Sequence, residues 1–302
     1  MTLDVSLRLL RAFATVAETG HVGRAAQRLY VSQPSLSQDI RRLEKAVRVT
    51  LFTRTSRGME LTPPGQELFD GVTAGLRSID RAAQSAAVIG GLTERSITVA
   101  FTPSVGNRLM PGLLPVLAHA VPTVNIDERE VDTGEVDPGV REGRFDLGFA
   151  HCPARHTDLS FTLLAEERCC VALAADCELA GQSVVGLSQV RGLEMLLWPR
   201  ETAPQYYDHL VGICEASGFT PRIVTGPRRA IIRAYLLSTR STFCLLPASA
   251  SELRVPGIVF LDVADEHAHI PLFSIRRADD ARDDVSAVEA ATRTHCDSLL
   301  AS

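Results

Sequence analysis

The stretch Gly23-Arg-Ala-Ala-Gln-Arg-Leu-Tyr-Val-Ser-Gln-Pro-Ser-Leu-Ser-Gln-Asp-Ile-Arg-Arg-Leu-Glu44 decides how the front of this 302-residue chain folds. Its first part spaces Ala25, Ala26 and Leu29 along one face of a short helix. Ser32 then offers a hydroxyl of the kind that caps the first turn of a second helix. We therefore predict two short helices joined by a tight turn, which is a helix-turn-helix unit.

The second helix of this pair has an apolar face and a polar face. Leu36, Ile40, Leu43 and Val47 are spaced 4, 3 and 4 residues apart, so they share a buried face. The opposite face begins with amide and hydroxyl groups that suit base edges, and Arg residues that suit phosphates flank them. The residues that we expect to contact double-stranded DNA are Gln33, Pro34, Ser35, Ser37, Gln38, Arg41, Arg42, Arg54 and Arg57.

Two further elements surround this pair. Apolar residues at helical spacing predict a helix over residues 10–17 that ends near Gly20. After the pair, alternation around Gly58 predicts a small β-hairpin, or wing, over residues 51–61. We place all of these elements in one domain, residues 1–62.

A long helix follows this domain. Thr62 is a favourable cap, the next two prolines fit a first turn, and Gly90-Gly91 ends the pattern. At ~1.5 Å per residue, a helix over residues 63–91 is about 40 Å long. Apolar residues recur along it at helical spacing, so we expect it to link two domains and to pair with a partner helix.

Charge is distributed unevenly along the chain. Residues 1–62 hold 10 basic and 5 acidic side chains, whereas the remainder holds 21 basic and 31 acidic ones. A basic head suits a polyanion such as DNA, while the acidic body serves another purpose.

From Ser96 onward, predicted strands alternate with predicted helices. We expect strands over residues 96–101, 124–131, 146–150, 169–173, 195–198, 223–225, 243–246, 259–261 and 272–275. We expect helices over residues 106–120, 135–143, 205–217 and 228–237, and from about residue 284. This alternation predicts an α/β body of mainly parallel sheets, with ligands at the carboxyl ends of the strands.

Several motifs resemble those of the LysR-type transcriptional regulators. The resemblance is dense over about 65 residues and weaker beyond them. It rests on Leu10-Arg-Ala-Phe13, Arg24-Ala-Ala26, Val31-Ser-Gln-Pro-Ser-Leu-Ser37, Ile40-Arg-Arg-Leu-Glu44, Leu51-Phe52, Arg57-Gly58 and, in the body, Leu245-Leu-Pro247.

The resemblance implies an α+β multidomain protein. It would have an N-terminal winged helix-turn-helix, a linker helix and, over residues 92–302, an α/β effector domain of periplasmic-binding-protein type. In such a domain the chain crosses twice between two subdomains, here near Ser160 and Asp262, which gives residues 92–161 with 263–302 and residues 162–262. The resemblance further implies a homodimer or homotetramer that binds operator DNA and responds to a small-molecule effector, with no cofactor.

The chain departs from the family pattern at several positions, and in the body Arg240 and Thr242 replace the Gly-x-Gly that usually precedes Leu245-Leu-Pro247. Arg48 stands where the family has Gly after the second helix, so a left-handed turn would be held by a non-Gly residue. Gly23 stands where a Ser or Thr cap is usual, and we expect a weaker cap there. Gln38 replaces an Arg, which removes one expected DNA contact.

The carboxyl ends of the predicted strands define the expected effector site. Ser104 and Thr133 fit two descriptions equally well, as ligand contacts or as helix caps. Arg200 fits either an effector carboxylate or a surface ion pair. The full set of expected effector contacts is Thr102, Pro103, Ser104, Thr133, His151, Arg200, Thr202, Thr225 and Pro247.

Two other functions stay open at this point. His151 and Cys152 lie near cations that would favour a thiolate, so they suggest a thiol- or metal-responsive trigger, although no second metal-ligand cluster accompanies them. An enzyme is the other alternative, but the chain lacks GxSxG, P-loop, HExxH and GxGxxG motifs. The first residues do not form a secretory leader, and no apolar run approaches the ~18 residues of a membrane helix, so we expect a cytoplasmic protein.

Overall fold

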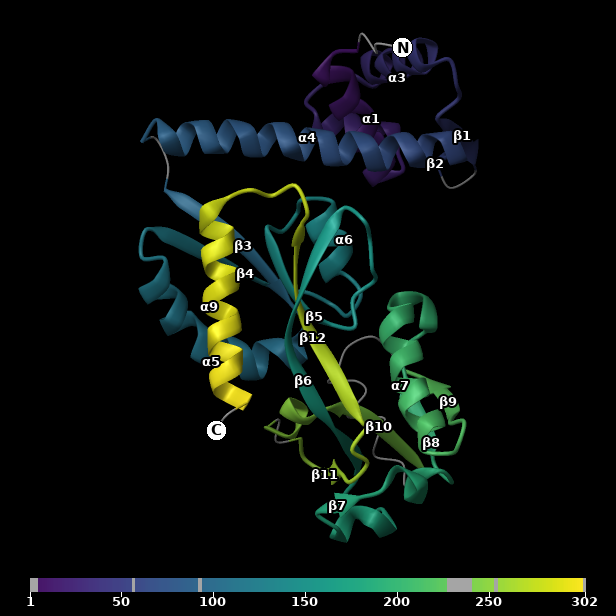
Figure 1. Cartoon of the computed structure of the whole chain (residues 1–302). Coiled ribbons are helices and arrows are strands. Elements are labelled where there is room, and N and C mark those ends of the chain that lie inside the picture. The colour runs from purple at the N-terminus through teal and green to yellow at the C-terminus, as the bar shows by residue number, and fades with distance from the viewer. Residues whose placement is uncertain (1–4, 56–57, 92–93, 227–240, 253–254, 301–302) are drawn as a thin grey trace. The chain divides into compact units, whose positions relative to one another are not determined.

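The computed structural model describes residues 5–55, 58–91, 94–226, 241–252 and 255–300. The chain divides into two units, residues 1–93 and 94–302 (Figure 1). Each unit has its own buried core, because no core cluster draws residues from both. The two units are therefore described separately.

The first unit contains the predicted helix-turn-helix, wing and long helix. Phe13, Leu36, Leu43 and Leu51 are fully buried at its centre. Of the apolar face predicted for the second helix of the pair, Leu36, Ile40 and Leu43 are buried as expected, and Val47 is half-buried. The elements are α1 (Leu7–Thr19), α2 (Val22–Arg28), α3 (Gln33–Val47), β1 (Phe52–Thr55), β2 (Gly58–Leu61) and α4 (Pro63–Ile89).

Local contacts explain where α3 begins and ends. The Ser32 hydroxyl accepts a hydrogen bond from the Ser35 N–H at 3.3 Å, as its capping role predicts. At the other end Arg48 has φ 60°, so the left-handed turn is indeed held by a non-Gly residue. The cap expected at Gly23 was wrong. His21 caps α2 instead, because its Nδ1 accepts the Gly23 N–H at 3.0 Å.

The wing is anchored to the end of α1 by its backbone. The Met59 N–H donates to the Gly20 carbonyl at 2.9 Å. Gly58 has φ 134°, and a Cβ on it would lie 2.3 Å from the Gly20 oxygen. Only glycine fits this close approach, and the contact fixes where the wing stands relative to the helices.

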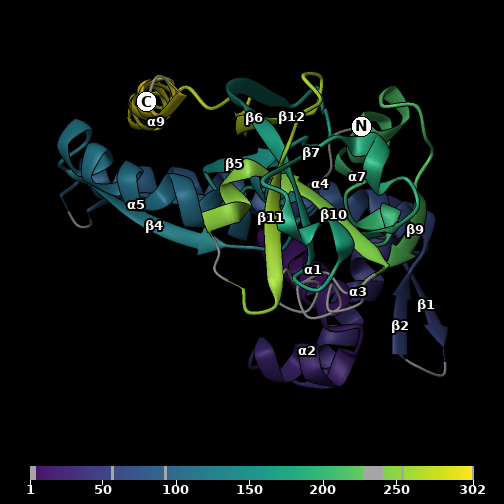
Figure 2. The ribbon, with the colours of Figure 1, turned by 90° about the horizontal axis from the view of Figure 1, so that it is seen from below.

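The second unit is built on a long, twisted arrangement of strands, visible in both Figure 1 and Figure 2. The strands pair in the order β4-β3-β5-β12-β6-β10-β8-β9, with β11 and β7 beside β6. Their bounds are β3 (Arg95–Phe101), β4 (Val124–Glu130), β5 (Leu147–His151), β6 (Leu159–Ala174), β7 (Val184–Val185), β8 (Glu194–Leu197), β9 (Arg222–Thr225), β10 (Thr242–Pro247), β11 (Ile258–Val263) and β12 (His269–Arg277).

Strand β6 joins two lobes of this unit. Its residues 159–168 pair with β12 in the sheet of the first lobe, whereas residues 169–174 pair with β10 and β11 in the sheet of the second. We expected a strand only over 169–173 and a crossover near Ser160. Ser160 already lies inside β6, and the change of sheet comes between Arg168 and Cys169.

Helices cover the sheets of both lobes. In the first lobe, one core lies beneath α5 and α9 and another beneath α6. Helix α5 starts at Pro103 rather than at residue 106, and it contains two prolines inside its span. The bounds are α5 (Pro103–Ala120), α6 (Val136–Arg141), α7 (Pro204–Ala216), α9 (Asp283–Leu300) and the short 3-10 turns η1 (Glu178–Gly181), η2 (Leu187–Val190), η3 (Arg200–Thr202) and η4 (Ala248–Glu252).

The helix expected over residues 228–237 lies outside the described residues. Within the described part of the chain, no helix has the length and apolar character needed to cross a membrane.

Candidate DNA interface and effector site

The polar face of α3 is open to solvent. Gln33, Pro34, Gln38, Arg41 and Arg42 are exposed. Two more of the expected contacts, Ser35 and Ser37, are half-buried on the same helix, and Arg54 is exposed on the first strand of the wing. Arg57 lies outside the described residues.

A buried acid on α3, not singled out from the sequence, holds the helix to α1. The Asp39 side chain is only 6% exposed and accepts a bond from the Arg8 guanidinium at 2.9 Å. Arg42 lies 3.8 Å from the same carboxylate and remains 56% exposed. An acid inside an otherwise apolar face gives little sequence signal, because helical spacing alone would place it on either side.

The expected effector contacts of the first lobe gather at one sheet edge. Strands β3, β4 and β5 run parallel, so their carboxyl ends meet there. Thr102 and Ser104 follow β3, and their hydroxyls lie 3.2 Å apart. Thr133 follows β4 and does not cap α6, whose first turn is preceded by Glu135. His151 is the last residue of β5.

The second lobe meets this edge through η3 and α7. A Cβ on Gly134, next to Thr133, would lie 1.9 Å from the Thr202 carbonyl oxygen, so the two backbones touch. Thr225 lies beside Leu197 at the ends of paired strands, and Pro247 is buried opposite Cys169. We call this meeting line of the two lobes the seam.

Two polar atoms are buried at the seam without a partner among the described residues. They are Thr202 Oγ1 and His151 Nδ1. The other ring nitrogen of His151, Nε2, lies 3.2 Å from the carboxylate of Glu167. The centre of the His151 ring lies 5.9 Å from the centre of the Tyr206 ring on α7. Neither Glu167 nor Tyr206 was predicted from the sequence, because each is brought to His151 only by the folding of distant segments, β6 and α7.

Arg200 has a partner already. Its guanidinium binds the Asp208 carboxylate at 2.7 and 2.6 Å, and this pair is exposed. Of the two descriptions that the sequence left open, the surface ion pair is the one present.

The surroundings of Cys152 do not favour the alternative of a reactive thiol. Burial raises the pKa of Cys152 to about 12, and the charge of Glu166 raises it further than Arg155 lowers it. The nearby cation therefore does not produce a thiolate at neutral pH. No group of three metal-ligating side chains occurs among the described residues.

A winged helix-turn-helix joined to a two-lobed α/β body defines a class, the DNA-binding regulators that carry a separate sensing domain. Residues 7–66 match the family model described as bacterial regulatory helix-turn-helix protein, lysR family, and residues 90–296 match the LysR substrate binding domain. The chain belongs to the LysR family of transcriptional regulators.

Relatives in the family are similar along most of their length. The regulator AlsR of Bacillus subtilis is 29% identical and covers 82% of both chains. IlvR of Caulobacter vibrioides is 30% identical over 86% of this chain and 88% of its own.

Solved structures of the family share the fold. CbnR, a LysR family transcriptional regulator, superposes with a TM-score of 0.74 at 25% identity, covering 97% of this chain and 99% of CbnR. Full-length CbnR in complex with its target DNA gives a TM-score of 0.73 at 25% identity, with 96% and 100% covered.

Proposed function

We propose that this regulator reads operator DNA with the polar face of α3 and that a small molecule bound at the seam controls it. The observation that carries the proposal is the exposed row of amide, hydroxyl and guanidinium groups on a helix capped by Ser32. The complex of CbnR with its target DNA supports the same use of the fold.

The side chains divide into two roles. Gln33, Pro34, Ser35, Ser37 and Gln38 lie on the first half of α3, which enters the major groove and reads base edges. The four Arg residues, at positions 41, 42, 54 and 57, hold phosphates on either side.

A pair of variants separates base reading from phosphate binding. Gln33→Ala relaxes the preference at one position of each half-site by ~1–3 kcal/mol, whereas Arg54→Ala weakens binding to every duplex and lowers the salt slope by about one. Fluorescence anisotropy with operator variants at several salt concentrations measures both. An equal loss on all sequences for Gln33→Ala, or an unchanged slope for Arg54→Ala, contradicts these roles.

The effector lies at the seam, between Thr102, Pro103, Ser104, Thr133 and His151 on the first lobe and Thr202, Thr225 and Pro247 on the second. Support comes from the two unpartnered buried atoms there, since a buried polar atom without a hydrogen bond costs about 1–3 kcal/mol that a ligand can recover. Arg200 is left out because Asp208 holds it.

A metabolite screen tests the seam as the effector site. The effector raises the melting temperature of the full chain in a concentration-dependent way, since it binds the folded state. Thr202→Val removes the unpartnered hydroxyl and weakens that shift. Thr102→Val, on the other side of the seam, tests the first lobe in the same way. If both variants show a shift as large as that of the wild type, the assignment is contradicted.

The protein acts as a dimer through α4. An apolar groove of about 520 Å³ runs along this helix, between it and α1 and the end of α3. Leu7, Val49 and Ile79 on its walls are 44%, 42% and 44% exposed. Gly71 and Gly75 are one turn apart in the groove and have open space above them, which admits the close approach of a second α4.

We propose three further properties of the protein. The functional boundaries are residues 1–62, 63–91 and 92–302. The protein works in the cytoplasm, where chromosomal DNA is found, and it has no catalytic activity of its own. Turnover of any compound by the purified protein contradicts the last of these.

A further inference from the structure

The first unit carries a single histidine. His21 is the only one among residues 1–93, and all the cysteines of the chain lie beyond that unit. Histidine is the side chain whose charge ordinarily changes between pH 5 and 8. Among the side chains of this unit, a dependence on pH near neutrality therefore points to His21.

His21 begins α2 by accepting a hydrogen bond. Its Nδ1 accepts the Gly23 N–H at 3.0 Å. A ring nitrogen accepts a hydrogen bond only while it carries no proton, so the proton of the neutral ring is on Nε2. Protonation of the ring turns Nδ1 into a donor that faces another donor, and the hydrogen bond is lost. The added positive charge also stands at the amino end of a helix, where the helix dipole disfavours it.

The cap matters because α2 is short. The helix has only 7 residues, and a helix of this length has little stability of its own. A side-chain cap shifts the equilibrium of the helix that it begins by about two- to thirtyfold. Ala25 and Ala26 of α2 are buried in the same core as Leu36 of α3. The order of α2 therefore affects where α3 lies.

The cap also lies close to the residue proposed to read a base. A Cβ on Gly23 would lie 3.2 Å from both Cε1 and Nδ1 of His21, and 3.8 Å from Oε1 of Gln33. The lack of a side chain at residue 23 leaves room for the ring, so the ring, the first turn of α2 and Gln33 meet at one point. The wing is anchored beside this point, because the carbonyl of Gly20 accepts the Met59 N–H at 2.9 Å.

The charged groups around the cap do not compensate for its loss. Those on the end of α1, on α2 and on the described part of the wing are Glu18, Arg24, Arg28, Arg54 and Glu60. Both acids have partners, since Glu18 binds Arg28 at 2.8 Å and Glu60 accepts from a Thr hydroxyl at 3.1 Å. The first turn of α3 is uncharged. The ion pairs formed by the described residues of this unit do not involve His21.

We propose that His21 is a positioning residue that makes sequence-specific DNA binding depend on pH. The neutral ring holds the first turn of α2 and, through it, the place of Gln33. Acidification removes the hydrogen bond, loosens α2 and lowers the preference for the operator. This role rests on the proposed base reading by Gln33, and it gives the first unit an input of its own, separate from the effector.

Anisotropy of the full chain at about pH 8 and about pH 5.5, at constant ionic strength, tests this role. The probes are a labelled duplex from the region upstream of the chain's own gene and a scrambled duplex of equal composition. The readout is the ratio of the two affinities, because the general gain of positive charge at low pH strengthens binding to both duplexes alike. For the wild type, we expect this ratio to fall at least about fivefold from the higher pH to the lower one.

Three variants identify the group responsible. Asn is a good capping residue that does not titrate, so His21→Asn keeps the high ratio at both pH values, within about twofold. His21→Ala lacks the cap at both pH values and shows the low ratio throughout. His119→Asn is the matched control, because His119 is an exposed histidine on α5 of the second unit, and it retains the wild-type profile.

Hydrogen exchange measures the cap without DNA. After correction for the intrinsic effect of pH, we expect amides of residues 20–30 in the wild type to exchange about two- to thirtyfold faster at the lower pH. In His21→Asn the corrected rates agree at the two pH values.

Four results overturn the proposal. They are a wild-type ratio that does not change with pH, a His21→Asn profile as steep as that of the wild type, corrected exchange rates that are equal at both pH values in the wild type, and a higher ratio at the lower pH, which would mean that the protonated ring contacts DNA directly. A wild type that does not distinguish the two duplexes at about pH 8 contradicts the proposed function instead, and hydrogen exchange still reports on the cap.

Discussion

Among the described residues, three other than glycine adopt a left-handed backbone, and each lies in or beside a site proposed above. Tyr30, with φ 55°, forms the turn of the helix-turn-helix, Arg48 ends α3, and Cys152, with φ 43°, follows His151 at the seam. Such conformations cost on the order of 1–3 kcal/mol and persist where the surrounding structure fixes them. The sequence predicted only Arg48, because family comparison identified a missing Gly there.

Replacing Arg48 with Gly tests the strain at this residue. Gly adopts φ 60° without steric penalty, so Arg48→Gly stabilises the folded chain by up to about 1 kcal/mol after allowing for the greater freedom of the unfolded state. Urea denaturation measures the change. A destabilised variant would show that the Arg48 side chain, rather than its backbone, matters to the fold.

At the scale of elements, local patterns predicted the first unit well. Caps such as Ser32 and Thr62, and the spacing of Leu36, Ile40 and Leu43, act within one helix, so they are legible in sequence. The seam was harder to predict from the sequence. Its contacts join β5 to β6 and η3 to the β4–α6 turn, and only the pairing of strands far apart in the chain creates them.

Strand β6 shows the same limit. Its residues 159–168 carry a mixture of apolar and charged side chains, among them Glu166, Glu167 and Arg168. This mixture lacks the regular alternation of a half-buried strand, so the strand was not predicted there. The pairing of this segment with β12 changes register between Leu272 and Phe273, and this bulge interrupts the usual alternation of the strand. The expected effector residues were therefore identified mainly from strand ends, and Glu167 was missed.

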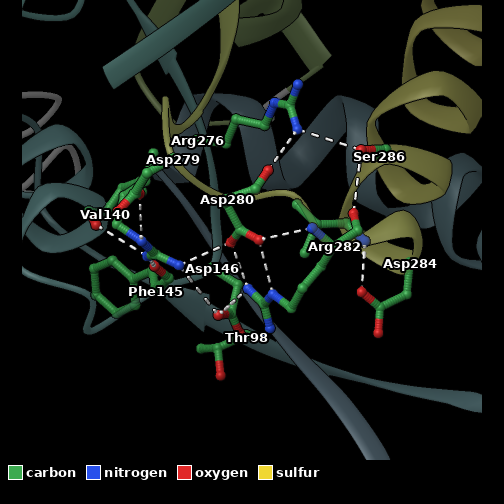
Figure 3. A network of polar contacts seen from close by, with 12 residues as sticks. Thr98, Val140, Phe145, Asp146, Arg276, Asp279, Asp280, Arg282, Asp284 and Ser286 are labelled. Atoms are coloured by element: carbon green, nitrogen blue, oxygen red, sulfur yellow. Dashed lines mark hydrogen bonds and ion pairs between the residues drawn. The ribbon is translucent and has the colours of Figure 1, made fainter. Parts of the chain in front are cut away.

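The connection from β12 to α9 is held by a network of charged groups (Figure 3). The Asp280 side chain is 3% exposed and accepts bonds from Arg277 at 2.8 Å and from Arg282 at 2.7 Å. Arg282 also binds Asp146 at 2.6 Å, at the start of β5. These bonds fix the returning strand to the first lobe.

Asp280→Asn tests how far this network stabilises the body. Burial raises the pKa of Asp280, but the hydrogen bonds and charge of Arg282, with Arg277, lower it by more. A lowered pKa in the folded state adds stability above the unfolded value of about 3.9, and that stability is lost as the pH falls.

The variant is therefore less stable than the wild type by about 3 kcal/mol at pH 7, and the difference shrinks as the pH approaches 4 and falls below it. Urea denaturation across this pH range measures both quantities. A difference that stays constant with pH would show that ionisation of Asp280 contributes nothing.

The whole molecule is proposed to work as two copies of the chain joined through α4. Gly75→Leu places a side chain in the α4 groove where the structure has open space, so the single chain tolerates it, and helix propensity improves by about 1 kcal/mol. The partner helix does not tolerate it, and the dimer dissociates at least tenfold more readily by sedimentation equilibrium.

Gly212→Leu is the matched control for this change. Gly212 is also a helical glycine with open space around it, but it lies on α7 in the body. We expect Gly212→Leu to leave the association constant of the dimer unchanged. Equal weakening by both variants, or by neither, would contradict α4 as the dimer surface.

The most direct test of the central claim is anisotropy of the full-length protein with a labelled duplex from the region upstream of its own gene, beside a scrambled duplex of equal composition. We expect tighter binding to the natural duplex and an affinity at least about 100-fold lower at 200 mM than at 50 mM salt. Failure to bind either duplex at 50 mM salt would contradict it.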